Sequence, residues 1–187
     1  MTMTRFILAL AVVIFSVPVM AAEKTPIQKL DERAVELLDK KNENQIKQFD
    51  AIRAAHGIIK AVENVQSSLV RAVKSCGTQN PDMKEALETR LSDWRLSVRP
   101  SIQQGKSRLE KMILLQDIAK PSEVRAYLKA FDEAIAYRDK NIAAMPVSDK
   151  ESCEKMLKEM DKSEKDLPKL LIENLGLDKD LNVKPAA

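Results

Sequence analysis

Apolar residues recur at helical spacing along most of the chain, and the polar or proline-containing gaps between these stretches mark where helices end. Spacings of three and four residues place the apolar side chains on one face of each helix, as in helices that pack against one another. The pattern predicts a short helix over 26–40 and four main helices over 43–75, 81–118, 121–145 and 149–175. No stretch alternates between apolar and polar residues as a strand would. The sequence therefore predicts an all-α fold.

Residues that favour helix ends lie at several of the predicted boundaries. Asn80 and Ser148 are suited to cap helix N-termini. Gly77 and Gly176 can adopt the left-handed conformation that closes a helix. Asp166 is predicted to cap a separate final helical piece. Beyond that piece we expect a flexible C-terminal tail over residues 178–187.

Pro100 lies inside the apolar pattern of the 81–118 helix. An interior proline removes one helical hydrogen bond and clashes with the preceding turn. Because the periodicity continues on both sides of Pro100, we expect a kink in this helix.

Short connections force neighbouring helices to run antiparallel, so the helices should form an elongated up-down bundle, with four main helices and a short N-terminal helix. In this topology Cys76 and Cys153 lie at the same pole, and we predict a disulfide between them. The chain-entropy model gives such a long loop a stabilisation of roughly 4 to 5 kcal/mol. The alternative is a pair of buried free thiols, as in a cytosolic protein.

The predicted lengths of two helices conflict with this disulfide. At about 1.5 Å per residue, the 81–118 helix would outrun the 121–145 helix by about 20 Å and hold Cys153 away from Cys76. The bond therefore requires a strong bend at Pro100 or a 121–145 helix that starts closer to the cysteine pole.

Residues 1–22 have the pattern of a secretory signal peptide. A positively charged start is followed by the apolar run 6–15 and by small residues that end at Ala21 and Ala22, and cleavage after either alanine fits. The alternative is an uncleaved anchor, but a bilayer span needs about 20 apolar residues and a proline interrupts this run. We expect a periplasmic or secreted protein with a single helical bundle domain over 23–177 and no transmembrane segment in the mature chain.

The amino-acid composition argues against two classes of function, nucleic-acid binding and phosphate binding by Gly-rich loops. The chain has 31 Lys and Arg residues against 28 Asp and Glu residues, a net charge of +3, which is far from the basic excess typical of nucleic-acid binding. Only four of its 187 residues are glycine, which argues against Gly-rich phosphate loops. We therefore predict no nucleic-acid partner.

His56 is the only histidine, which excludes metal motifs built from two histidines. It lies between Ile52 and Ile59, beside the apolar face, and we expect a buried or boundary position there. Carboxylates are scattered among lysines on polar faces, without a marked acid and base pair. We therefore predict no metal, no cofactor and no catalysis.

Helical bundles can hold haem between histidine and methionine side chains, which is the alternative hypothesis. Methionine at helical spacing is ordinarily core filler, and the sequence has no motif for covalent haem attachment. The candidate methionine ligands are Met83, Met112, Met145, Met156 and Met160.

Charge is unevenly distributed along the chain. Residues 84–111 are mainly basic and residues 149–180 are mainly acidic. The simpler interpretation is that these two segments attract each other within the bundle. The functional interpretation is a basic face around Arg95 and Arg99, beside Trp94, that docks an anionic partner.

The sequence as a whole favours binding over catalysis. Long amphipathic helices present faces and grooves to other chains. We predict an exported helical binding protein of the cell envelope, an adaptor or chaperone-like factor whose partner is another protein or an envelope component. The alternative is a haem or small-ligand carrier that uses the bundle interior.

Overall fold

The computed structural model describes residues 23–140 and 147–177, and it is helical in nearly all of these positions. No strand occurs within these two ranges, which confirms the all-α prediction. The elements in chain order are α1 (Pro26–Leu38), α2 (Glu43–Gln79), the 3₁₀ helix η1 (Pro81–Met83), α3 (Lys84–Leu115), α4 (Pro121–Lys140) and α5 (Lys150–Leu175). The predicted signal peptide over 1–22, the predicted tail over 178–187 and the predicted helix end at Met145 lie outside the described residues.

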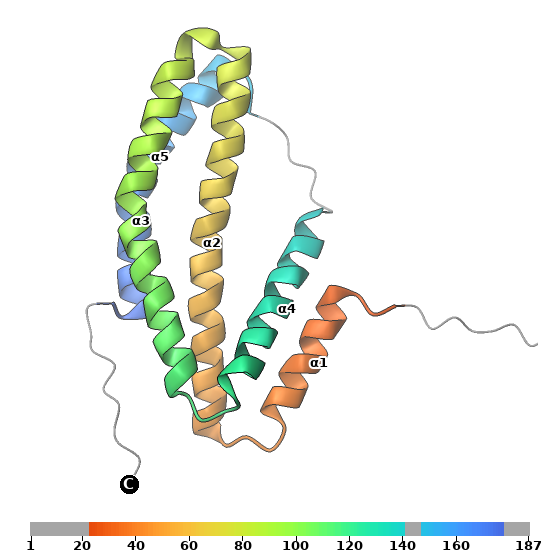
Figure 1. Cartoon of the computed structure of the whole chain (residues 1–187). Helices are drawn as coiled ribbons and strands as arrows, with labels where there is room; N and C mark the ends of the chain where they lie inside the picture. The colour runs from red at the N-terminus through yellow and green to blue at the C-terminus, as the bar shows by residue number, and fades with distance from the viewer. Residues whose placement is uncertain (1–22, 141–146, 178–187) are drawn as a thin grey trace, which may run out of the picture.

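The helices α2 and α3 form a long antiparallel hairpin that supports the other helices (Figure 1). Near the turn of this hairpin, α5 packs against α3 and α2. At the opposite end α1 and α4 lie side by side. We call the first region the disulfide half (residues 60–104 with α5) and the second region the α4 half (residues 43–59 and 105–115 with α1 and α4).

The predicted disulfide is present between Cys76 and Cys153, whose Cα atoms are 5.9 Å apart. Both cysteine side chains are fully buried. The side-chain amide of Asn80 donates hydrogen bonds to the carbonyl oxygen of Cys76 at 3.2 Å and to that of Ser148 at 2.9 Å. The end of α2 and the start of α5 are therefore joined by one covalent bond and by hydrogen bonds.

The length conflict assumed a short connection between α4 and α5, but nine residues separate the described end of α4 from the start of α5. The helix α4 is described as far as Lys140, and α5 begins at Lys150. The stretch 141–149 that joins them is long enough to span roughly 30 Å when extended. The helix α3 runs on through Pro100 as a single kinked helix, as predicted.

The structure corrects two predicted helix ends. Gly77 does not close a helix with a left-handed conformation; it is buried inside α2, which continues to Gln79. A Cβ atom at Gly77 would lie 3.1 Å from Cγ of Lys84, so the absence of a side chain allows α3 to start close to α2. The predicted 81–118 helix ends at Leu115, because the side-chain amide oxygen of Gln116 accepts hydrogen bonds from the backbone of Ile118 at 2.6 Å and Ala119 at 3.0 Å.

The last helix is also capped differently from the prediction. Its N-cap is Asp149, whose carboxylate accepts a hydrogen bond from the backbone of Ser152 at 2.8 Å, and not Ser148. No separate piece begins at Asp166, because α5 is continuous through Pro168. Gly176 does close it with the left-handed conformation predicted, at φ +56°.

Candidate functional site

The structure separates the three residues predicted to bind a partner. Trp94 is fully buried, and its indole Nε1 donates a hydrogen bond to Oγ of Ser163 at 3.0 Å. It therefore belongs to the core between α3 and α5 and not to the surface that carries Arg95 and Arg99. The expectation that Trp94 shares a docking face with the arginines is corrected, because one residue of rotation around α3 turns the side chain by about 100°.

Arg95 and Arg99 are both exposed and line a groove between α2 and α3 with a volume of about 300 Å³. Neither arginine forms an ion pair with any residue in the described ranges. The α2–α3 groove at this level is lined by Glu63, Gln66, Arg95, Arg99, Ile102, Gln103 and Lys106. Three cations and one carboxylate therefore surround it.

Arg90, on the same helix, behaves differently. It contacts two carboxylates of α5, with Nε 2.7 Å from Oδ1 of Asp161 and a second nitrogen against Glu164, and its side chain is 19% exposed. Burial alone would lower the pKa of Arg90. The hydrogen bonds and charges of Asp161 and Glu164 outweigh this effect and raise the pKa. At this residue the basic segment and the acidic segment do attract each other within the bundle, as the simpler interpretation predicts. Arg95 and Arg99 are left out of this pairing.

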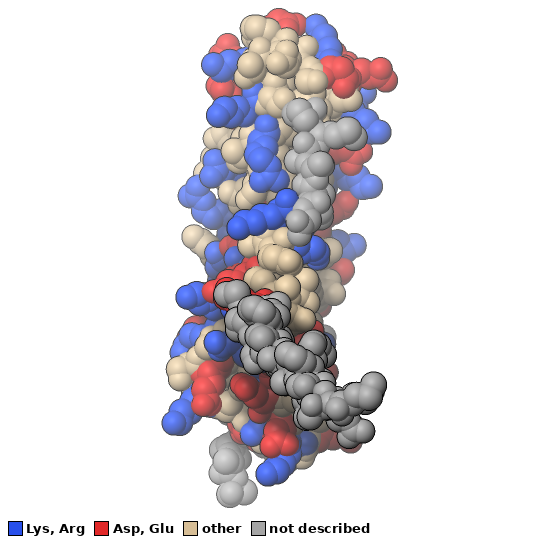
Figure 2. Space-filling model, turned by 90° about the vertical axis from the view of Figure 1, so that its right-hand side faces the viewer, with Lys and Arg blue, Asp and Glu red and all other residues tan. Residues whose placement is uncertain are grey.

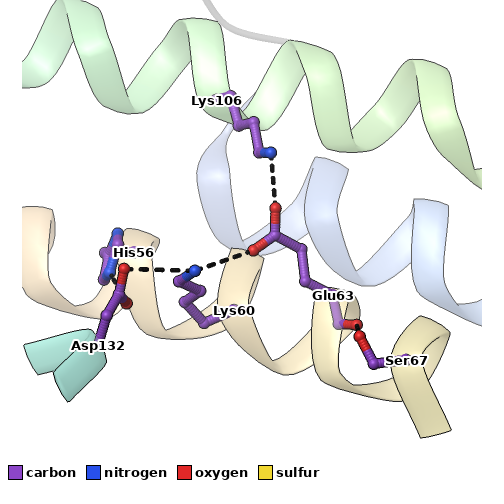
Figure 3. Close-up of polar contacts among 6 residues, drawn as sticks. All are labelled: His56, Lys60, Glu63, Ser67, Lys106 and Asp132. Atoms are coloured by element: carbon purple, nitrogen blue, oxygen red, sulfur yellow. Dashed lines mark hydrogen bonds and ion pairs between the residues drawn. The ribbon is translucent and has the colours of Figure 1, made fainter. Parts of the chain in front are cut away.

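A chain of polar side chains links α4, α2 and α3 at the lower end of the groove (Figure 3). Nε2 of His56 is 2.7 Å from Oδ1 of Asp132, and Nζ of Lys60 is 3.3 Å from the other oxygen of that carboxylate. Lys60 also reaches Glu63 at 3.3 Å, and Glu63 in turn binds Nζ of Lys106 at 2.6 Å. We call these five residues the polar chain.

The polar chain shifts two pKa values. Burial alone would raise the pKa of Glu63, but the hydrogen bonds and charges of Lys106 and Lys60 outweigh it and lower the pKa. Burial would lower the pKa of Lys60, but the charges of Asp132 and Glu63 outweigh it and raise the pKa. Both side chains are therefore held in their charged forms.

The helix α4 packs mainly against α1 and diverges from α3 along its length (Figure 1), but two of its side chains reach the hairpin. Its Arg125 pairs with Glu110 of α3, and its Asp132 pairs with Lys60 of α2. Glu110 lies one turn beyond Lys106 on the α3 stripe that carries Arg99. In the α4 half, α4 thus forms ion pairs with both helices of the hairpin, and no described helix lies over the α2–α3 groove in the disulfide half.

The face of the molecule on the right-hand side of Figure 1 differs in charge between its upper and lower parts. Figure 2 shows a column of Lys and Arg side chains down the middle of the upper part of the face, whereas basic and acidic side chains are interspersed below.

Other chemistry is sparse in the parts of the chain that the structure describes. These parts contain no group of three or more His, Cys, Asp or Glu residues that could hold a metal ion. None of the described helices is long and apolar enough to cross a membrane. The side chain of His56 is only 13% exposed, its ring lies edge-on to that of Phe131, and its Nε2 is 2.7 Å from Oδ1 of Asp132. Of the candidate methionines, Met145 lies outside the described residues.

No known protein helps to interpret this surface. No family model matches the chain, and searches of curated proteins and of solved structures find no significant similarity.

Proposed function

We propose that this chain is an exported helical binding protein of the cell envelope, an adaptor or chaperone-like factor that acts through protein contacts and without catalysis. The observation that carries the proposal is the open part of the α2–α3 groove. There, Arg95 and Arg99 are exposed and have no ion-pair partner among the described residues, while Arg90 on the same helix is fully paired.

The chemistry of the groove suits a protein partner. Arginine is enriched at protein interfaces because its flat, forked guanidinium group makes several hydrogen bonds to carboxylates at once. Two arginines one helical turn apart, beside the amides of Gln66 and Gln103, offer many donors to an anionic surface. Within residues 23–140 and 147–177, the two arginines have no ion pair that must break before they bind.

The disulfide supports the exported location. Disulfides persist in oxidising compartments and are rare in the cytosol. The Cys76–Cys153 bond is consistent with the predicted signal peptide over 1–22 and a periplasmic or secreted protein.

Crosslinking in the native compartment, followed by purification, tests the proposal. The wild-type protein is compared with the double variant Arg95→Glu, Arg99→Glu and with the control Lys158→Glu, Lys162→Glu, which reverses two exposed lysines at the same spacing on α5. We expect one or more defined protein partners that are lost in the arginine variant and kept in the lysine variant. A reproducible absence of partners, or equal recovery with both variants, would overturn the proposal.

A further inference from the structure

Resting on the function proposed above, we infer that the partner places an acidic amphipathic helix in the open part of the α2–α3 groove. This helix would lie along the groove and present carboxylates one turn apart to Arg95 and Arg99.

The shape of the groove favours a helix as its occupant. Its two walls are the helices α2 and α3, which have no strand edge to pair with an extended peptide. In the α4 half a helix already forms ion pairs with both α3 and α2, through Arg125 and Asp132 of α4. A partner helix laid along the groove would pair with the same two helices.

The charges of the groove specify an acidic helix. Arg95 and Arg99 are four residues apart, and Lys106 lies seven residues further along the same stripe of α3. At about 1.5 Å per residue these cations are spaced by about 6 Å and then about 10 Å along the helix axis. Carboxylates at the same spacing on a partner helix would face all three cations.

Apolar surface lies in and beside the groove. Ile102 is the one apolar residue of its lining, and Val70, one turn beyond Gln66 on α2 and outside the lining, has an exposed fraction of 38%. A helix with one acidic and one apolar stripe fits such a surface, because the apolar stripe can cover these side chains.

Glu63 is the one carboxylate in the groove lining, and its replacement is a second, independent test of the inference. It neutralises Lys106 and would repel an incoming carboxylate. Replacing Glu63 with glutamine should therefore strengthen binding of an acidic helix, whereas replacing the arginines should weaken it.

The test uses the full-length protein and labelled synthetic peptides in a fluorescence anisotropy titration at two salt concentrations. The probe is an amphipathic helical peptide with glutamates at the spacing of Arg95, Arg99 and Lys106. Three comparison ligands are the same peptide with glutamines in place of glutamates, the acidic peptide interrupted by a central proline, and inorganic polyphosphate. Circular dichroism checks that each protein variant keeps its helical content.

We expect salt-dependent binding of the acidic helical peptide. Arg95→Glu, Arg99→Glu should weaken it about tenfold or more, Lys158→Glu, Lys162→Glu should change it less than about twofold, and Glu63→Gln should tighten it several-fold. The glutamine and proline peptides should bind at least about tenfold more weakly.

Equal binding of the glutamine peptide, or binding that the arginine variant does not weaken, would overturn the inference. Equal binding of the proline-interrupted peptide would also overturn it, because the groove would then select charge without helical shape. Arginine-dependent binding of polyphosphate without binding of the peptide would overturn it in favour of a general polyanion site. If crosslinking finds an arginine-dependent protein partner and the peptide does not bind, the inference fails while the proposed function stands.

Discussion

The two halves of the hairpin are stabilised in different ways. In the disulfide half, α5 is joined to α2 by the Cys76–Cys153 bond and to α3 through Arg90 and the buried Trp94. In the α4 half, α1 contributes no buried residue, and part of the contact between α4 and α2 passes through the polar chain. The same two helices thus support one tightly fixed layer and one layer with a partly polar interface.

The stripe of α2 that faces α4 changes in character along the helix. The stripe of α2 that faces α4 contains Phe49, which packs against Tyr127 with ring centroids 4.8 Å apart, and His56. Continued at helical spacing into the disulfide half, this stripe reads Ser67, Arg71 and Lys74, all exposed. In the disulfide half this stripe of α2 is therefore polar, unlike the part that packs against Tyr127.

Removing the disulfide should have the largest effect and should act on one half. The double variant Cys76→Ser, Cys153→Ser is expected to lower the free energy of unfolding by roughly 4 to 5 kcal/mol, because the unfolded chain gains the entropy of an open loop. Hydrogen exchange should show faster opening of α5 than of α4. Equal loss of protection in α4 and α5 would contradict the division of the molecule into two differently stabilised halves.

Replacing Trp94 with phenylalanine should cause the next largest loss in the free energy of unfolding. The variant loses the hydrogen bond to Ser163 and leaves a void in the core, and we expect a loss of about 2 kcal/mol in chemical denaturation. The matched control is Leu96→Ala on the same helix, where the side chain is 57% exposed and the change should cost less than about 0.5 kcal/mol. Similar losses in the two variants would argue against a buried Trp94.

Periodicity was sufficient to predict most of the fold. The apolar stripes identify the helices, and the pole shared by Cys76 and Cys153 follows from alternating helix directions, so the residue pattern was enough to predict the disulfide. The apolar stripe that contains Leu91, Trp94 and Val98 also predicts that Trp94 points inward. This stripe predicts the location of Trp94 better than the position of Trp94 beside Arg95 in the sequence does.

The polar chain and the open groove could not be predicted in the same way. The Lys60–Glu63 pair is visible from its spacing of three residues. The contacts of Asp132 with His56 and of Lys106 with Glu63 depend on the axial offset and rotation of separate helices. Hydrophobic periodicity specifies which face of a helix is buried but not which residue lies opposite it.

Asp132→Asn should loosen the α4 half selectively. The substitution removes the charge that binds Lys60 and weakens the contact with His56, at a cost of about 1 kcal/mol for a half-exposed group. Hydrogen exchange should increase in α4 and remain unchanged in α5. The control Asp139→Asn removes a carboxylate near the end of the same helix, where its partner is the adjacent Arg138, and should leave exchange in α4 nearly unchanged.

The pH dependence of the Glu63 contribution should be the smallest effect, because this carboxylate is only partly buried and its ion pairs are screened. Its pKa is lowered in the folded state, so the stabilisation is fully present above its ordinary value near 4.5 and is lost as the pH falls through the lower folded value. The stability difference between wild type and Glu63→Gln, measured by denaturation at a series of pH values, should be constant near neutrality and should shrink below about pH 4.5. The variant Glu88→Gln, which removes an exposed carboxylate of α3 that has no ion pair in the described ranges, corrects for the loss of one surface charge. A difference that grows as the pH falls would show that Glu63 is protonated more readily in the folded protein, and would contradict the ion pairs that close the lower end of the groove.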